Sequence, residues 1–260
     1  TNETVCNGTA RPARLGVIVG GPIGCELAQT FQRLGSQVVL LHRGAHVLKK
    51  EDADAAEIVQ QALRQDGVQL LLDTSLLAVE PRGDAKGLRY RNGAGETADM
   101  TVDAILVATG RLPNVEALGL EDAGVAFDPH TGIQVDDRLR TSNPRIFAAG
   151  DVCSRYQFTH AADFLARTVM ANALFMGRQK ASTLTIPWCT YTDPQIAHVG
   201  ITEQQAATQG ISLETFTLPL TEVDRAVLDG ETEGFARVHA KKGSDTILGA
   251  TVVARHAGDM

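Results

Sequence analysis

The stretch LGVIVGGPIGCELAQTF, from Leu15 to Phe31, decides the fold of the first half of the chain. It opens with a continuous apolar run, which is typical of a strand buried on both faces. Two glycines follow, and apolar residues then recur at the spacing of one helical face, at Ile23, Leu27, Phe31 and Leu34. The stretch therefore predicts a strand, a glycine-rich turn and a helix, which together begin a βαβ unit.

The residues that follow extend this unit into a domain. Gly35 ends the predicted helix, and QVVLLHR (37–43) is expected to form a second buried strand. The further elements expected are a helix over about 52–65, a strand in VQLLL (68–72), antiparallel hairpins turning at RGDAKG (82–87) and RNGAGE (91–96), and a buried strand in AILVATG (104–110). Together they predict an α/β fold with a doubly wound, Rossmann-like parallel sheet.

The pattern changes after LPN (112–114). We expect an apolar strand in RIFAAGDV (145–152) that ends on Gly-Asp, and then a helix over about 159–175. Strand-like, turn-rich segments follow from Ile186: WCTYTD (188–193), LETFTLPL (213–220), GFARVHAK (234–241) and ILGATVVA (247–254). This last part of the chain is expected to form a separate α+β piece.

Bulk properties exclude several kinds of partner. The net charge of −7 and the lack of a basic run argue against a nucleic-acid partner. No apolar run approaches the ~20 residues of a membrane-spanning helix, so no membrane partner is expected. The polar start has no signal-peptide pattern and opens on Thr1 rather than Met, which we interpret as processing, trimming or excision from a longer protein.

The four cysteines are widely spaced and form no CxxC or zinc pattern: Cys6, Cys25, Cys153 and Cys189. This usage fits a reducing cytosol, where each is expected to be a small buried hydrophobic residue. We therefore expect a cytoplasmic protein with no metal site.

The glycine-rich turn nearly matches the dinucleotide-binding fingerprint G-x-G-x-x-G. Gly21 and Gly24 occupy the second and third glycine positions, but Val19 occupies the first. The first glycine permits a tight turn, and a β-branched side chain tolerates little of that backbone range. We expect strain of ~1–3 kcal/mol at this special position. If it fell entirely on binding, affinity would drop by roughly five- to a hundredfold, which would weaken the site without abolishing it. A glycine turn that binds no ligand remains the alternative.

Basic residues follow the second predicted strand, where the fingerprint expects an acid for a ribose 2′-hydroxyl or an Arg for a 2′-phosphate. His42 and Arg43 stand there, His46, Lys49 and Lys50 lie just beyond, and no carboxylate appears before Glu51. This cluster favours NADP(H) over NAD(H), with a solvated basic loop as the alternative.

Three motifs then extend the pattern along the chain: GGPIGCE (20–26), ATGRLPN (108–114) and TSNPRIFAAGD (141–151). In order and spacing the chain resembles the flavin-dependent pyridine nucleotide–disulfide oxidoreductases, in the branch of mercuric reductase and dihydrolipoamide dehydrogenase. The resemblance implies a connecting segment (1–11), an NAD(P)-binding domain (12–130), the C-terminal part of an FAD-binding domain (131–182) and the start of a dimerisation domain (183–260).

The resemblance also implies roles for individual residues. Asp151 would bind the ribityl chain of FAD, although a helix-capping or turn carboxylate is its alternative role, and Glu26 would pair with a lysine beside the flavin and nicotinamide. Pro22 stands where glutathione reductase has a gating tyrosine. The implied cofactor-contacting residues are Gly20, Gly21, Pro22, Ile23, Gly24, Glu26, His42, Arg43, Lys49, Gly110, Arg111, Gly150, Asp151, His160 and Ala161.

The family's redox-active C-x-x-x-x-C pair, its N-terminal flavin fingerprint and its C-terminal His–Glu pair have no counterpart in this sequence. No catalytic residue is therefore assigned, and the chain resembles the middle and rear of a larger reductase. The intact protein is expected to bind FAD and NAD(P)H as a homodimer, and this chain alone is expected to be inactive. A non-catalytic NADP(H)-binding module and an interaction remnant are the alternatives.

Overall fold

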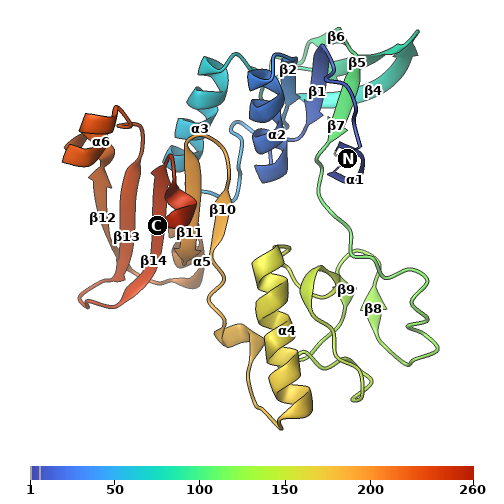
Figure 1. The fold of residues 1–260 in the computed structure, drawn as a ribbon, viewed down its shortest axis with the longest axis vertical. Helices are drawn as coiled ribbons and strands as arrows, with labels where there is room; N and C mark the ends of the chain where they lie inside the picture. The colour runs from blue at the N-terminus through green and yellow to red at the C-terminus, as the bar shows by residue number, and fades with distance from the viewer. Residues whose placement is uncertain (1, 6) are drawn as a thin grey trace. The chain divides into compact units, whose positions relative to one another are not determined.

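The computed structural model describes residues 2–5 and 7–260 (Figure 1). The chain forms two compact units, the first made of Thr1–Thr109 with Pro187–Met260 and the second of Gly110–Ile186. The expected burial of Cys6 lies outside the described residues, and a short helix, α1 (Asn2–Val5), precedes the first sheet. None of the described helices is long and apolar enough to cross a lipid bilayer.

The first unit begins with the predicted βαβ arrangement. Its four-stranded parallel sheet has the order β3-β2-β1-β7. The strands are β1 (Arg14–Ile18), β2 (Gln37–Leu41), β3 (Gln69–Leu71) and β7 (Ala104–Val107), and the helices are α2 (Pro22–Arg33) and α3 (Ala53–Gln65). Val17 is paired with Leu40 on one side and with Leu106 on the other, and all three belong to a core that also includes residues of both helices. The α/β fold expected from the sequence is confirmed.

The opposite face of this sheet is covered by an antiparallel layer. The layer has the order β4-β5-β6 and consists of β4 (Ser75–Arg82), β5 (Ala85–Arg91) and β6 (Thr97–Val102), where the sequence predicts hairpins. Leu88 and Val102 of this layer pack against Ile18, Val39 and Leu41. Because neighbouring residues of a strand point to opposite faces, β1 and β2 are buried on both sides.

The last part of the chain forms a five-stranded antiparallel sheet in the order β10-β11-β14-β13-β12. Its elements are β10 (Trp188–Thr190), β11 (Gln195–Gly200), α5 (Glu203–Gln209), β12 (Leu213–Pro219), α6 (Asp224–Asp229), β13 (Phe235–Lys241) and β14 (Ile247–Ala254). Four of these strands lie where the sequence predicts them, and β11 is the one it misses. Ile196, Phe235 and Val253 join the same core as Val47 and Ala55, so this sheet and the nucleotide-domain elements share one interior.

The second unit contains little regular structure besides the helix α4 (Thr159–Leu174), which confirms the helix expected there. Two short strands, β8 (Phe127–Asp128) and β9 (Gly132–Ile133), pair with each other, and 3-10 turns lie at Gly150–Val152 and Ala181–Thr183. Its core is a small cluster made of Val115, Leu120, Val125, Ile133 and Ala148.

The prediction of a strand in RIFAAGDV (145–152) is wrong. Within it, Phe147 forms one isolated bridge with Arg140, and Gly150–Val152 turns into a 3-10 helix. A strand is stabilised by a ladder of hydrogen bonds to its neighbours, and among the described residues this segment has only that single bridge. Apolar character alone does not supply the missing partner.

The two compact units divide at residues 109/110 and 186/187. The domain boundaries expected after residues 130 and 182 therefore do not coincide with the unit boundaries. Residues 110–130 belong to the second unit, and their assignment to the nucleotide-binding domain stays a prediction.

Candidate functional site

The glycine-rich turn joins β1 to α2, and Val19 is its strained residue. Val19 has a φ of 77°, in the left-handed region that favours glycine. The prediction that position 19 requires a glycine-like backbone is therefore confirmed, and a β-branched side chain occupies it. The Val19 N–H donates to the Leu41 carbonyl oxygen at 2.9 Å, which ties the turn to the end of β2.

The glycines of the turn meet different steric conditions. A Cβ at Gly24 would lie 2.2 Å from the Val19 carbonyl oxygen, so only glycine lets α2 approach the end of β1 this closely. A Cβ at Gly21 would have nothing within 4 Å. Gly21 thus leaves open space over the turn, which is the position where the fingerprint lets a pyrophosphate approach the backbone.

The N-terminus of α2 can receive an anion. Gly21 is its N-cap residue, Pro22 opens the helix, and Ile23 follows in the first turn, which carries no acidic residue. No side chain of the described residues caps this end. The unpaired N–H groups of the first turn and the helix dipole both favour a negatively charged group here.

His42 lies against the turn rather than in the solvent. Its Nδ1 accepts a hydrogen bond from the Gly20 N–H at 3.2 Å. Burial, followed by the nearby His46, lowers the pKa of His42, so the ring is neutral at neutral pH. Of the predicted readers of a 2′-phosphate, His42 therefore provides no positive charge, while Arg43 and Lys49 are exposed and form no ion pair in the described part of the chain.

Glu26 has a partner that the sequence does not reveal. Its Oε1 accepts a hydrogen bond from the Tyr191 N–H at 2.9 Å, which joins α2 to the segment after β10. Gln29 continues this contact, because its side chain both donates to the carbonyl oxygen of Asp193 and accepts from its N–H. The pairing of Glu26 with a lysine stays a prediction.

A buried polar cluster lies where the β2–α3 connection meets the antiparallel sheet, and the sequence analysis misses it. The Trp188 indole N–H donates to Glu51 at 2.9 Å, and the Trp188 ring lies 4.4 Å from the ring of His198. Burial raises the pKa of Glu51 to about 7. Beside it, Arg237 forms ion pairs with Asp52 and Asp54. The chain's single tryptophan, two residues after the strand-like segments begin at Ile186, was the one available signal.

In the second unit the flavin-like motifs come together. Arg111 of ATGRLPN forms an ion pair with Asp151 at 3.0 Å and donates to the Gln157 carbonyl oxygen. Gly150 has a φ of 80°, and a Cβ there would lie 3.2 Å from that of Ala162 on α4. Neither the 3-10 turn that contains Asp151 nor α4 has a side-chain cap among the described residues, so Asp151 caps neither of them, and its alternative role as a turn carboxylate stays open.

The start of α4 also fits an electron-rich ligand. Its first turn carries no acidic residue. His160 is exposed and stacks on Phe158 with ring centroids 5.5 Å apart, while Ala161 is fully buried. Gly110, with a φ of 125°, precedes Arg111 and is the first residue of this unit. Arg111, Gly150, Asp151, His160 and Ala161 thus belong to one compact unit.

The described thiols are poorly suited to redox or nucleophilic chemistry. Cys25 is buried as predicted, whereas Cys153 and Cys189 are only half-buried. Burial raises the pKa of Cys153 and of Cys189 to about 11, and it raises that of Cys25 further. Because the thiolate is the reactive form, all three thiols are unreactive near neutral pH. Over the same described residues, no group of three or more His, Cys, Asp or Glu side chains could hold a metal ion.

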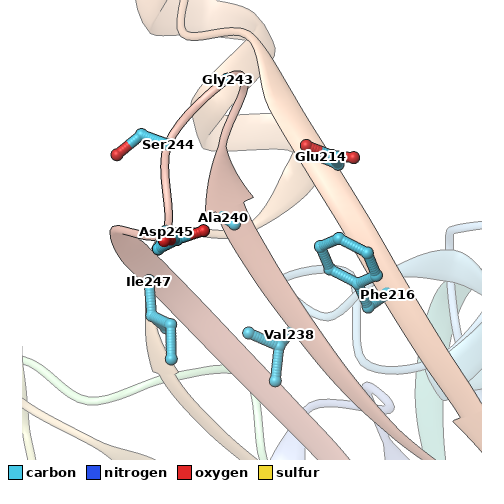
Figure 2. A pocket seen from close by; sticks show the side chains of 8 residues that line it. All are labelled: Glu214, Phe216, Val238, Ala240, Gly243, Ser244, Asp245 and Ile247. Atoms are coloured by element: carbon cyan, nitrogen blue, oxygen red, sulfur yellow. The ribbon is translucent and has the colours of Figure 1, made fainter.

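A shallow hollow lies on the antiparallel sheet of the first unit. Figure 2 shows its side chains, which come from β12, β13, β14 and the turn before β14: Glu214, Phe216, Val238, Ala240, Gly243, Ser244, Asp245 and Ile247. Phe216 lies opposite Val238 across the two strands. Phe216 is 58% exposed and Ile247 is 66% exposed, so the hollow has an open apolar floor.

Comparisons with known proteins extend over both units. A family model described as pyridine nucleotide-disulphide oxidoreductase matches residues 3–164. A second model, the dimerisation domain of the same proteins, matches residues 186–260. Both matches agree in order with the domains that the sequence predicts.

Individual relatives are similar to most of this chain. A mercuric reductase of Staphylococcus aureus is 37% identical over 249 residues, which are 96% of this chain and 45% of that protein. A dihydrolipoyl dehydrogenase of Thermus scotoductus is 34% identical over 96% of this chain and 54% of its own length. The HOCl-induced flavoprotein disulfide reductase RclA from Escherichia coli has a similar structure, with a TM-score of 0.87 and 30% identity over 98% of this chain and 57% of that one. The chain spans about half the length of the curated relatives it matches.

Proposed function

The chain belongs to the pyridine nucleotide-disulphide oxidoreductase family, and from that premise we propose that it supplies the nucleotide-binding part of an FAD- and NAD(P)H-dependent reductase. The whole protein would reduce a redox disulfide, in the manner of a disulfide or Hg(II) reductase. When bound, the cofactors would supply the chemistry: a hydride would pass from nicotinamide to flavin, and two electrons would pass from the reduced flavin to the disulfide, whose sulfurs would take up protons. The observation that carries the proposal is the open, uncapped turn between β1 and α2.

The turn would hold the pyrophosphate of the nucleotide. Gly24 lets α2 approach the end of β1, Gly20 and Gly21 form the turn between them, and Pro22 and Ile23 begin the helix. The dipole of α2 and the N–H groups of its first turn would stabilise the phosphate charge. The residues present fit this group, because Gly21 leaves the space above the turn open.

Arg43 and Lys49 would select NADP(H). Both are exposed, and both follow the end of β2, where the 2′-phosphate of a bound dinucleotide is expected. Positive charge at this position favours a phosphate over a free hydroxyl. The preference for NADP(H) over NAD(H) therefore depends on these two residues rather than on the neutral His42.

The second unit would contact FAD through Gly110, Arg111, Gly150, Asp151, His160 and Ala161. Asp151 would accept hydrogen bonds from the ribityl chain, and its ion pair with Arg111 at 3.0 Å fixes the direction of the carboxylate. The N-terminus of α4 would stabilise negative charge on a reduced ring. Glu26 would lie beside nicotinamide and flavin.

We further propose that the intact protein is a cytoplasmic homodimer and that this chain alone is inactive. The match of residues 186–260 to a dimerisation domain supports the dimer, and so does the exposed apolar floor of the hollow on β12 to β14 (Figure 2). The high thiol pKa values support inactivity, because no described cysteine readily forms a thiolate. The same observation favours a second candidate function, a nucleotide-binding module without turnover.

The test is a calorimetric titration of the chain with NADPH and separately with NADH. The proposal expects binding of NADPH that is tighter than that of NADH. Arg43→Ala and Lys49→Ala should each reduce this preference, because each removes one charge near the 2′-phosphate. Lys50→Ala, next to Lys49, is the matched control for a change of net charge.

Gly21→Ala provides a test of the turn itself. Its φ of −79° is allowed for alanine, and a Cβ there meets nothing within 4 Å, so the folded protein should keep its stability. The added methyl group would occupy the space proposed for the pyrophosphate and should weaken the binding of both dinucleotides by about tenfold or more. Unchanged affinity in Gly21→Ala would place the nucleotide elsewhere and reject the proposed site.

A further inference from the structure

Both backbone groups of Gly20 are held by the connection that follows β2. The Gly20 N–H donates to His42 Nδ1 at 3.2 Å. The Gly20 carbonyl oxygen accepts from the Leu48 N–H at 2.8 Å. Together with the bond from the Val19 N–H to the Leu41 oxygen, three hydrogen bonds hold the backbone of the strained Val19 and of Gly20 next to it.

These restraints matter because Val19 is strained. A non-glycine residue with a φ of 77° persists only where its surroundings over-determine the conformation. Two of the three hydrogen bonds use backbone acceptors, which any sequence would provide. The third uses the His42 side chain, so it is the one restraint that depends on the identity of a residue.

We propose that His42 is a positioning residue for the pyrophosphate-binding turn, because its unprotonated Nδ1 accepts the Gly20 N–H and holds the backbone that Val19 strains. The inference rests on the proposed function for its consequence in binding. It replaces the role that the sequence suggests for His42, which is a contact to the 2′-phosphate. The two roles differ in what they do to NADH, which has a pyrophosphate but no 2′-phosphate.

The proposal predicts a dependence on pH. Protonation of the ring places a hydrogen on Nδ1 and removes the acceptor for Gly20. Burial and the neighbouring His46 and Lys49 lower the pKa of His42, whereas Asp73 and a backbone hydrogen bond of His46 act in the opposite direction. The restraint is therefore present at neutral pH and is lost as the pH falls below the ordinary histidine value of about 6.5.

The first experiment uses the free chain and needs no ligand. Amide hydrogen exchange at Gly20 is compared among the wild-type protein, His42→Ala and His42→Asn, with the Val68 amide, which donates to the Leu63 carbonyl oxygen away from the turn, as an internal control. We expect His42→Ala to raise exchange at Gly20 by about tenfold. His42→Asn should keep the protection, because its side-chain oxygen can replace Nδ1 as the acceptor.

The pH dependence separates the proposed role from a general loss of stability. After correction for intrinsic exchange, Gly20 in the wild-type protein should lose protection in acid, whereas His42→Asn has no titrating ring and should not. Equal protection of Gly20 in His42→Ala and the wild-type protein would overturn the proposal. So would a loss in His42→Ala that His42→Asn fails to restore.

The second experiment measures dinucleotide binding to the same variants. We expect His42→Ala to weaken the binding of NADPH and of NADH by the same factor, about two- to tenfold, and His42→Asn to restore both affinities. A loss confined to NADPH would show that His42 contacts the 2′-phosphate and would overturn the positioning role. Failure of the wild-type chain to bind either dinucleotide would reject the proposed function, and exchange at Gly20 would still decide whether His42 holds the turn.

Discussion

Two stretches of similar sequence, AILVATG (104–110) and RIFAAGD (145–151), adopt different structures. The first forms β7, in which Leu106 pairs with Val17 and is 4% exposed. The second makes one bridge and then a 3-10 turn. An apolar run therefore predicts burial, whereas a strand also requires a neighbour that receives its backbone hydrogen bonds.

The same contrast separates the two compact units. The parallel sheet of the first unit is covered on both faces, by α2 and α3 on one side and by the β4–β6 layer on the other. The second unit has a small core, and its helix α4 leaves large apolar side chains exposed, among them Met170 at 55% and Leu174 at 69%. Stability should therefore be distributed unevenly along the chain.

Hydrogen exchange should show the largest difference between the two units. Amides of residues 104–108 lie in a buried ladder, so they should exchange only when much of the first unit opens. Amides of residues 145–152 have mostly turn-like partners and should exchange about a thousandfold faster. Equal protection of the two stretches would show that the second unit is as stable as the first, and the comparison would then fail.

The pH dependence of unfolding should also differ between the units. The pKa of Glu51 is raised to about 7, chiefly by burial. Its pKa in the unfolded chain is about 4.3, so the folded state binds the proton more tightly. This stabilisation is present at low pH and is lost as the pH rises toward 7. We expect Glu51→Gln, which keeps an acceptor for Trp188, to remove roughly 2–3 kcal/mol of the change in unfolding free energy between pH 5 and pH 8.

Urea unfolding of the wild-type protein and Glu51→Gln at several pH values measures this difference. Two carboxyl groups of the second unit should change the free energy of unfolding in the opposite direction as the pH changes, because backbone hydrogen bonds lower the pKa values of Asp128 and Asp137. Their stabilisation is present at neutral pH and is lost as the pH falls. An unchanged pH profile in Glu51→Gln would contradict the buried carboxyl described at the junction with Trp188.

The smallest expected effects come from two left-handed residues, one in each unit. Val19 has a φ of 77° and Ala117 has a φ of 58°. Replacing either residue with glycine relieves the backbone but adds entropy to the unfolded chain, so each change in unfolding free energy should stay within about 1 kcal/mol. Val19→Gly should in addition tighten NADPH binding by about fivefold or more.

Thermal unfolding and calorimetric titration of both variants make this comparison. Ala117→Gly is the matched control, because it relieves the same kind of backbone strain far from the proposed nucleotide site in sequence. Tighter binding in both variants would mean that the gain is not specific to the turn. An unchanged affinity in Val19→Gly would show that Val19 does not weaken the site.

Periodicity and glycine positions predict the first unit well, because β1, α2 and β2 are each specified by local patterns that their own neighbours satisfy. The strand at residues 145–152 could not be judged from its own residues, since its pairing depends on distant segments. The missed strand β11 has the mixed sequence QIAHVG, in which His198 interrupts the apolar pattern. His198 is nevertheless buried and bonded to Thr251 of the adjacent strand.

The candidate site was predicted in part for the same reason. The fingerprint identifies Val19 as a strained position from residue chemistry alone, and its φ confirms this. The ring of His42 could not be placed, because a basic residue after β2 can point to solvent or back to the turn. The contacts of Glu26 with Tyr191 and of Glu51 with Trp188 join segments 165 and 137 residues apart, and no local pattern indicates them.

The single tryptophan of the chain, Trp188, lies in the first unit, so its intrinsic fluorescence reports on that unit. Trp188 donates to Glu51 and lies against His198, so its indole fluorescence depends on the contact between the β2–α3 connection and the antiparallel sheet. Separation of these parts would expose the indole to water and shift its emission to longer wavelength. The unlabelled chain therefore carries a built-in fluorescence reporter for this contact within the first unit.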